Sequence, residues 1–360
     1  MADLEKNGGE EHWSRIRADY PGLAERSYLD TSSFGLMALS TAEAARAEQE
    51  QLMREGSVRF GQWREQGSVA MRRTVADSFG GKADHVALVP NFSVGMALLA
   101  SLMKHRPRVL LVGGDYPTLH TPFTGKDLEP VLIHPKSDGS LPMDAIAQAI
   151  ERERPQLVAI SHVQWATGWK TDLRAVAALC RAQGAWSVID ATQSWCCAPI
   201  DARAMGIDIL GASGYKWPLA GPGNGFMHLS KEVQAEITER SGKDPIAQLT
   251  GGHTDPVAFT RLGDALERYA AHGPEAIAKR VDLLCDHAVN ALDAAGVRVL
   301  NGRDPEHRAG ILMIEGDQLR LSKLHAQGIQ VVLRGKGIRL GIHFYNTAED
   351  NDRLVDVLKV

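Results

Sequence analysis

Short apolar segments alternate with longer segments of helical periodicity through the middle of the chain. The predicted strands are Val86–Pro90, Arg108–Gly113, Leu157–Ser161, Ser187–Asp190, Asp208–Ala212 and Gly225–Leu229. The predicted helices between them include Val94–Lys104, Met143–Arg154 and Leu173–Gln183. This alternation predicts an α/β fold with a mostly parallel sheet that is flanked by helices. Ligands of such sheets bind beyond the carboxyl ends of the strands, so the residues after each strand are the candidate functional residues.

The C-terminal part of the chain has a different pattern. A long helical segment at Arg261–Ala295 is interrupted near Gly273–Pro274, and a last helix begins at Ala348. The predicted strands of this part are Gly310–Ile314, Ile329–Leu333 and Ile338–Ile342. We therefore predict a large domain over residues 20–260 and a smaller α+β domain over residues 261–360, with residues 1–19 packed nearby. A length of 360 residues suggests two domains, at a typical size of roughly 150 residues per domain.

Composition narrows the class of protein. The chain is 44% hydrophobic and 23% charged, with 40 basic and 44 acidic residues. Because basic residues are not in excess, we predict no nucleic-acid partner. Its longest apolar segments are shorter than the ~20 residues of a membrane span, which predicts no membrane partner. The first residues, Met-Ala-Asp-Leu-Glu-Lys, lack the apolar core of a signal peptide. We therefore expect a cytoplasmic protein.

The cysteines predict neither a disulfide framework nor a metal site. The four cysteines are Cys180, Cys196, Cys197 and Cys285. Two of them are adjacent, and no CxxC or HxxxH pair provides the spacing of metal ligands.

Two polar segments that follow predicted strands indicate the chemistry. They are Val188-Ile-Asp-Ala-Thr-Gln193 and Ala212-Ser-Gly-Tyr-Lys216. A carboxylate such as Asp190, buried beside a ring nitrogen, holds that nitrogen protonated by charge pairing. A partly desolvated lysine such as Lys216 has a lowered pKa and forms a Schiff base with an aldehyde. Pyridoxal phosphate needs both groups; an isolated Asp is more often a helix cap and an isolated Lys a surface residue, so the prediction rests on the joint pattern.

The motifs Asp190-Ala-Thr-Gln193 and Ser213-Gly-Tyr-Lys216 resemble those of the class V aminotransferase family of fold-type I pyridoxal phosphate enzymes, which includes cysteine desulfurases and kynureninases. The similarity extends from Tyr28-Leu-Asp-Thr-Ser-Ser-Phe-Gly35 to Arg339-Leu-Gly-Ile-His-Phe-Tyr-Asn-Thr347 with Asp350. The resemblance implies a large domain that binds pyridoxal 5'-phosphate and a small C-terminal domain.

The resemblance also implies the residues that hold the cofactor. Lys216 would be the imine-forming lysine, Asp190 the partner of the pyridine nitrogen, and Gln193 the donor to the ring's phenolic oxygen. Tyr116, in Gly113-Gly-Asp-Tyr-Pro-Thr118, would stack on the ring, although it could instead pack in a turn. The implied phosphate ligands are Phe92 and Ser93 at the start of a helix, with Ser213 and Tyr215 beside the lysine.

Substrate and subunit contacts follow from the same resemblance. Arg339 would clamp the α-carboxylate of an amino acid, with Arg334 as the second candidate. His162 and Trp165 would line the pocket, although a histidine near a strand end is as often structural. Thr254 would reach the cofactor phosphate of the neighbouring subunit, although His253 stands where the family usually has glycine. This contact would make the protein a homodimer whose active site is completed across the interface.

The reaction is less constrained than the cofactor. The resemblance favours an aminotransferase that acts at Cα of an α-amino acid, and a kynureninase-like enzyme, a Cβ–S lyase or an epimerase remain alternatives. We do not expect this protein to be a cysteine desulfurase. Those enzymes need a nucleophilic cysteine shortly before the closing arginine, and the corresponding segment here, Gln330–Ile338, contains no cysteine. A non-catalytic cofactor-binding protein is disfavoured because Lys216, Asp190 and Arg339 are all present. A nucleotide-binding loop at Gly221–Gly225 is disfavoured because it lacks the following Lys-Ser/Thr and precedes a strand.

Overall fold

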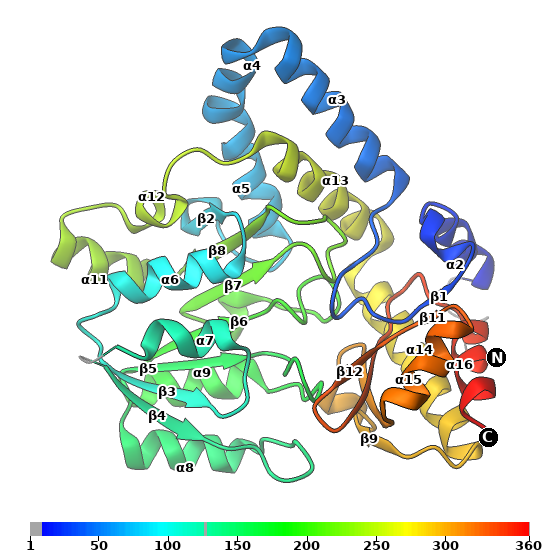
Figure 1. Ribbon diagram of the computed structural model, residues 1–360. Helices are drawn as coiled ribbons and strands as arrows, with labels where there is room; N and C mark the ends of the chain where they lie inside the picture. Colours follow the sequence, from blue (N-terminus) through cyan, green and yellow to red (C-terminus); the bar gives the residue numbers. More distant parts are fainter. Residues whose placement is uncertain (1–8, 126–127, 360) are drawn as a thin grey trace.

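The computed structural model describes residues 9–125 and 128–359, and its centre is a seven-stranded sheet in the order β2-β8-β7-β6-β5-β3-β4 (Figure 1). The strands are β2 (Val86–Val89), β3 (Arg108–Val112), β4 (Glu129–Ile133), β5 (Leu157–Ser161), β6 (Trp186–Asp190), β7 (Ile209–Ser213) and β8 (Gly225–Leu229). β8 is antiparallel to β2 and β7, and the other neighbouring pairs are parallel. The predicted mostly parallel sheet is confirmed, and β4 is an additional strand at its edge.

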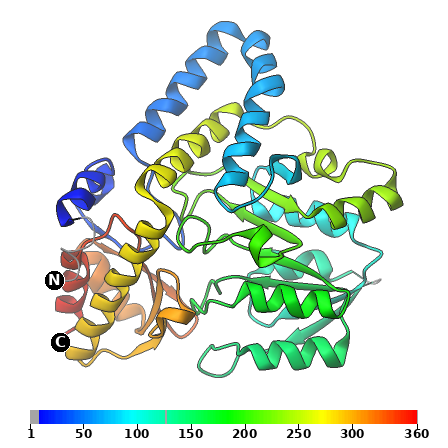
Figure 2. The same cartoon turned by 180° about the vertical axis from the view of Figure 1, so that it is seen from behind.

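Helices cover both faces of this sheet because its strands are apolar on both sides. Along β3, Val109 and Leu111 belong to one apolar cluster, whereas Leu110 and Val112 belong to the other. The helices whose residues pack in the first cluster are α6 (Phe92–Leu102), α7 (Pro117–His120), α11 (Lys231–Ser241) and α12 (Pro245–Thr250). Those on the opposite face are α8 (Met143–Glu153), α9 (Leu173–Ala182) and α10 (Ala202–Met205) (Figure 2).

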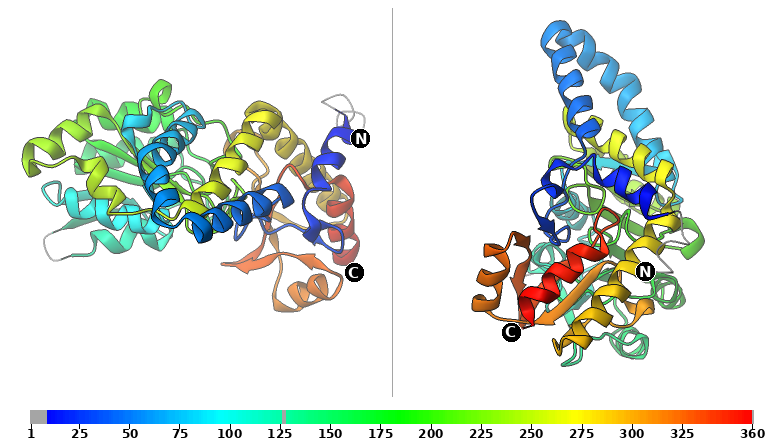
Figure 3. Two further views of the ribbon diagram at one scale, coloured as in Figure 1. Left: turned by 90° about the horizontal axis from the view of Figure 1, so that it is seen from above. Right: turned by 90° about the vertical axis from the view of Figure 1, so that its right-hand side faces the viewer.

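A helical hairpin projects from the part of the chain that holds the seven-stranded sheet, where the sequence analysis assigned no element (Figure 3). The segments are α3 (Leu39–Glu55), α4 (Ser57–Gln62), the π-helical turn η2 (Trp63–Gly67) and α5 (Ser68–Asp77). Helix α13 (Pro256–His272) packs along α3. Gly273, at φ 86°, ends α13, and Pro274 begins α14 (Pro274–Ala294), which confirms the predicted interruption.

The C-terminal part contains a four-stranded antiparallel sheet and a short parallel pair. The four strands, in sheet order, are β12 (Val332–Arg334), β13 (Gly337–Gly341), β10 (Ile311–Glu315) and β9 (Val299–Asn301). The parallel pair joins β1 (Ser27–Tyr28) to β11 (Ile329–Gln330). Besides α14, the helices of this part are α15 (Gln318–Ala326) and α16 (Ala348–Leu358) (Figure 1). Helix α2 (Glu10–Arg17) contacts α14 through an ion pair between Glu10 and Arg280.

N-terminal residues attach to this C-terminal part. Arg17 forms an ion pair with Asp350 at 2.8 Å, and Asp30 forms a β-bridge with Gly341. The segment that contacts the C-terminal sheet therefore extends beyond residue 19, and the predicted boundary between residues 260 and 261 lies inside α13. The division into two domains remains a prediction.

Among the described residues, no helix is long and apolar enough to span a bilayer. The same residues contain no cluster of three or more His, Cys, Asp or Glu side chains suited to a metal ion.

Candidate active site

The ends of five strands surround one cavity at the carboxyl edge of the parallel sheet. The residues that line it are Phe92, Ser93, Tyr116, Ser161, Trp165, Asp190, Thr192, Gln193, Ser213, Tyr215 and Lys216. They follow or end β2, β3, β5, β6 and β7, which is the edge where the sequence analysis expected ligands. The fold thus brings together the two motifs that suggested the chemistry.

Lys216 is buried in this cavity, with 6% of its surface exposed. Its Nζ lies 5.5 Å from the ring centroid of Tyr116 and 5.6 Å from that of Tyr215. Burial lowers the pKa of Lys216 to about 8, against the opposing effect of Asp190. Lys216 therefore has a larger neutral fraction at neutral pH than a surface lysine. The turn that holds Lys216 packs closely against Gly35, where a Cβ would lie 2.0 Å from the Lys216 carbonyl oxygen.

Asp190 ends β6 inside the same cavity and is 5% exposed. Its Oδ1 accepts a hydrogen bond from the backbone N of Thr192 at 2.8 Å. Burial raises the pKa of Asp190 to about 6, while the hydrogen bonds from Thr192 and the charge of Lys216 act in the opposite direction. A buried carboxylate of this kind is stabilised by a cationic partner, so the site fits a protonated ring nitrogen.

Hydroxyl groups and a helix N-terminus meet at one end of the cavity. Asn91 caps α6, since its Oδ1 accepts a hydrogen bond from the backbone N of Val94 at 2.9 Å. The backbone N of Phe92 donates to Ser213 Oγ at 2.9 Å, and Ser93 Oγ lies 2.7 Å from Thr118 Oγ1. Hydroxyls and backbone N–H groups at a positive helix end suit a phosphate group. The residues present therefore fit the phosphate of the implied cofactor.

Gln193 lines the cavity but already makes two internal hydrogen bonds. Its Nε2 donates to the carbonyl oxygen of Ser32 at 3.0 Å, and its Oε1 accepts from Trp217 Nε1 at 2.8 Å. A side-chain amide has two N–H donors, so one donor remains for a bound ligand. Its predicted bond to the phenolic oxygen stays a prediction.

Asp115 organises the aromatic side of the cavity and was missed in the sequence analysis. Its carboxylate accepts hydrogen bonds from the backbone N of Tyr116 at 2.7 Å and from Ser161 Oγ at 2.6 Å. Gln164 Nε2 donates to the same carboxylate at 3.0 Å. These bonds tie the end of β3 to the end of β5, where Tyr116 and Trp165 pack edge to face at 5.8 Å. The sequence feature that could have identified Asp115 is its position shortly after the predicted strand Arg108–Gly113.

Arg339 lies on β13, and it reaches toward the cavity from the C-terminal sheet. Its side chain is 2% exposed, and the guanidinium donates to the Trp165 carbonyl oxygen at 2.6 Å and to Ser33 Oγ at 2.7 Å. Asp30 lies 3.8 Å away. Burial lowers the pKa of Arg339 to about 10. The Nε atoms of Arg339 and Arg334 are both buried without a hydrogen-bond partner, so the geometry leaves both candidates open.

Besides Arg334 and Arg339, two further predicted site residues, His162 and Thr254, lie outside the residues that line the Lys216 cavity. His162 is 5% exposed, its Nδ1 lies 2.9 Å from Ser194 Oγ, and burial lowers its pKa to about 3. This arrangement is that of a neutral structural histidine, the alternative left open above. Thr254 accepts a hydrogen bond from Trp63 Nε1 at 3.1 Å in another cavity, so any contact with a cofactor phosphate would require a second subunit.

The fold is that of fold-type I pyridoxal phosphate enzymes. A family model, aminotransferase class-V, matches residues 123–354. The chain belongs to the class V aminotransferase family. Members of this family are enzymes that use pyridoxal phosphate, as the resemblance implied.

Three similar proteins are named for three different reactions. The chain is 24% identical to the uncharacterized aminotransferase YcbU of Bacillus subtilis, over 95% of this chain and 96% of that protein. It is 26% identical to isopenicillin N epimerase of Streptomyces clavuligerus, over 80% and 82%. An apo cysteine desulfurase from Thermococcus onnurineus NA1 superposes with a TM-score of 0.86 at 19% identity, over 96% of both chains.

The similarity to a cysteine desulfurase gives no support to the expectation that this reaction is excluded. That expectation now rests on the positions of the thiols alone. All four cysteines are buried, and none lines the Lys216 cavity.

Proposed function

We propose that this protein is an aminotransferase that removes the amino group of an α-amino acid through pyridoxal phosphate bound at Lys216. The observation that carries the proposal is the burial of Lys216 and Asp190 in one cavity beside Tyr116 and the N-terminus of α6. The overall similarity to an aminotransferase supports transamination over the other reactions of the family.

Each residue has a stated task in this proposal. Lys216 Nζ would hold the cofactor through its aldehyde carbon and would move the proton at the substrate Cα. Asp190 would hold the proton on the pyridine nitrogen, and Tyr116 would stack on the ring. Phe92, Ser93, Ser213 and Tyr215 bind the phosphate. The cofactor, when bound, supplies an electron sink for the negative charge that develops at Cα.

Arg339 binds the substrate α-carboxylate, because its planar pair of donors matches a carboxylate. Arg339→Ala should raise KM for an amino acid by one to two orders of magnitude, since a hydrogen bond to a charged group contributes ~1.5–3 kcal/mol. Steady-state kinetics will measure this, with cofactor absorbance as the control for folding. Arg334→Ala is the matched variant and should leave KM nearly unchanged. A larger rise in Arg334→Ala would transfer the role to Arg334.

The proposal includes a homodimer in which Thr254 contacts the cofactor phosphate of the partner subunit. A Lys216→Ala chain and a Thr254→Ala chain, each with low activity alone, should recover activity on mixing, because each mixed dimer then contains one site in which both residues are intact. Activity after subunit exchange is the measurement, and two Lys216→Ala chains with different tags are the control. Mixtures that stay inactive although mixed dimers form would show that each chain works alone.

The fate of the amino group tests the reaction itself. The holoenzyme is incubated with ¹⁵N-labelled amino acids, with and without a 2-oxo acid, and products are identified by mass spectrometry. Transamination predicts ¹⁵N in the amino acid formed from the 2-oxo acid, and no repeated turnover without it. Repeated release of ammonia without an acceptor would indicate a lyase instead. Cysteine in the same panel should yield no persulfide on the chain, because no thiol lines the cavity.

Epimerisation is the second candidate, supported by the similarity to isopenicillin N epimerase. It needs the same proton transfer at Cα but returns the proton to the opposite face. Exchange of the Cα hydrogen with deuterated water and inversion of the stereocentre, without loss of nitrogen, would favour this candidate over transamination.

A further inference from the structure

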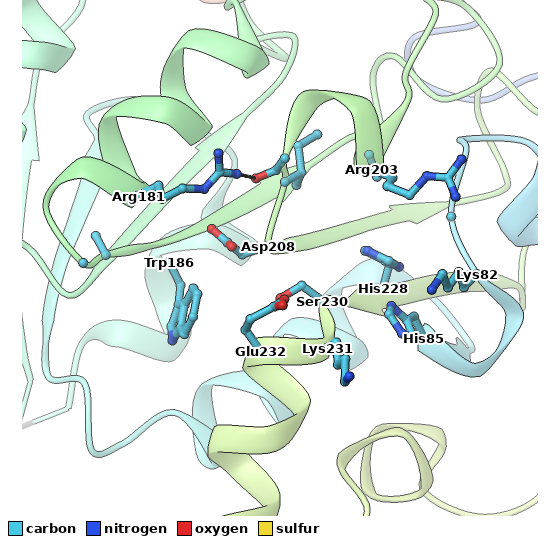
Figure 4. Close-up of a pocket in the computed structure, with 16 residues that line it drawn as sticks. Lys82, His85, Arg181, Trp186, Arg203, Asp208, His228, Ser230, Lys231 and Glu232 are labelled. Carbon is cyan, nitrogen blue, oxygen red and sulfur yellow. Dashed lines mark hydrogen bonds between the residues drawn. The ribbon is translucent and has the colours of Figure 1, made fainter.

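A second cavity lies at the opposite edge of the seven-stranded sheet from Lys216 (Figure 4). Trp186, which begins β6, and Asp208, which precedes β7, both line it. Asp190 ends β6 in the other cavity, so about 13 Å of strand separates the two, at roughly 3.3 Å per residue. The two cavities share no lining residue. This cavity is therefore a separate site.

Positive charge exceeds negative charge around this second cavity. Its charged lining residues are Lys82, Arg181, Arg203, Lys231, Asp208 and Glu232. Asp208 already accepts hydrogen bonds from the backbone N and the Oγ of Ser187, at 2.9 and 2.8 Å. The exposed side chains of Lys82, Arg203 and Lys231 have no ion pair or hydrogen bond with any residue that the structure describes. These cations are free to contact an anion.

A buried imidazole with an unsatisfied nitrogen also lines the cavity. His228, on β8, is 5% exposed, and its Nδ1 has no hydrogen-bond partner among the described residues. The ring of His85 lies 5.6 Å away, centroid to centroid. An unpaired buried polar atom is unfavourable, and a ligand or water that bonded to it would remove that cost. Burial lowers the pKa of His228 to about 4, so His228 offers a hydrogen bond and not a charge.

A helix terminus adds to the attraction for anions. Helix α11 begins at Lys231, and Ser230, Lys231 and Glu232 all line the cavity. The first backbone N–H groups of a helix have no partner within it and carry partial positive charge.

The remaining wall is apolar. Ala185, Ala202 and Ile207 are buried, and Trp186 is half-buried. Trp186 is held in place, since its Nε1 donates to Glu236 Oε2 at 3.1 Å. Figure 4 shows Trp186 and Arg181 toward one end of the cavity and Lys82, His85, Arg203 and His228 toward the other. One end of the cavity thus gathers Lys82 and Arg203, and the other offers the ring of Trp186 beside Arg181, whose guanidinium donates to the Gly206 carbonyl oxygen at 3.1 Å.

We propose that this second cavity binds a small organic anion with a carboxylate or phosphate group at one end and an apolar body. The anionic group contacts Lys82, Arg203 and the imidazole of His228, while the body lies on the apolar wall toward Trp186. The proposal is independent of the reaction proposed at Lys216.

Isothermal titration calorimetry of the holoenzyme tests this assignment with four probes: phenyl phosphate, benzoate, inorganic phosphate and benzyl alcohol. The cofactor in place prevents the phosphate probes from entering its own phosphate site. Phenyl phosphate or benzoate should bind once per chain, at least about tenfold more tightly than benzyl alcohol, because only they carry a charge for the cations. The tighter of the two identifies the anionic group.

Two double variants distinguish binding in this cavity from a general attraction of anions to the protein's positive charges. Lys82→Gln/Arg203→Gln should weaken binding about tenfold, whereas Lys104→Gln/Arg240→Gln, with the same change in net charge at other exposed positions, should not. Arg339→Ala should also leave the affinity unchanged. No saturable binding, an equal loss in both double variants, or a loss confined to Arg339→Ala would overturn the proposal.

Discussion

Replacing Lys216 by alanine should abolish the visible absorbance of the bound cofactor and lower turnover by at least about three orders of magnitude. Both effects have one cause, because the same amine bonds to the cofactor aldehyde and moves the Cα proton, and positioned proton transfer alone contributes 10²–10⁴-fold. Absorbance spectra and single-turnover kinetics are the measurements. Lys216→Arg should be equally impaired, because it keeps the charge without a nucleophilic amine. Turnover close to that of the unmodified enzyme in either variant would refute the role.

The stability of the apo-protein provides a control that separates catalysis from folding. Because burial lowers the pKa of Lys216 to about 8 from 10.5, the unfolded state binds this proton more tightly than the folded state. The free energy of unfolding should therefore rise between about pH 8 and pH 10.5, and Lys216→Ala should remove that contribution. An inactive variant whose apo form is at least as stable as the parent below pH 8 is inactive for chemical reasons.

Replacing Asp190 by asparagine should leave the cofactor bound but lower kcat by about two orders of magnitude. The amide keeps the shape of the side chain but provides no negative charge to hold the ring nitrogen protonated, and each 1.36 kcal/mol lost costs tenfold in rate. Stopped-flow kinetics and the cofactor spectrum, recorded on the same sample, measure the two effects. Asp190→Glu, which restores the charge on a longer side chain, should recover part of the rate.

The comparison of these Asp190 variants tests the negative charge of the side chain and not its hydrogen bond with Thr192. Asn can still accept the hydrogen bond from the backbone N of Thr192, so the local turn should survive. Full activity of Asp190→Asn would show that a neutral partner suffices at the ring nitrogen. Loss of the cofactor in Asp190→Asn would instead make Asp190 a binding residue.

The sequence predicted the sheet well because its strands are short, apolar and separated by helices. Leu157–Ser161 and Gly225–Leu229 match β5 and β8, and the interruption near Gly273–Pro274 follows from backbone chemistry alone. The pattern missed β4, whose Glu129 and Pro130 interrupt the apolar character of an edge strand. It also missed α3–α5, where Gly56, Gly61 and Gly67 obscure the helical period.

The candidate cofactor residues followed from local motifs, but their partners did not. Asp115 lies 46 residues before Ser161 in the sequence, and no local pattern joins the two. Arg339 reaches Trp165 across 174 residues and from a different sheet. Such contacts depend on how distant parts of the chain pack together, and the hydrophobic periodicity of the sequence does not predict that packing.

The amino-acid sequence by itself determined the alternation of strands and helices, the family, and the presence of one lysine and one carboxylate after neighbouring strands. These features are local, because they depend on residue types within a few positions of one another. The tertiary structure decided that His162 is buried against Ser194 and not in the Lys216 cavity, and that Lys82, which precedes β2, and cations from α9, α10 and α11 line a second cavity. Burial and convergence depend on residues distant in the sequence, and only the folded chain brings those together.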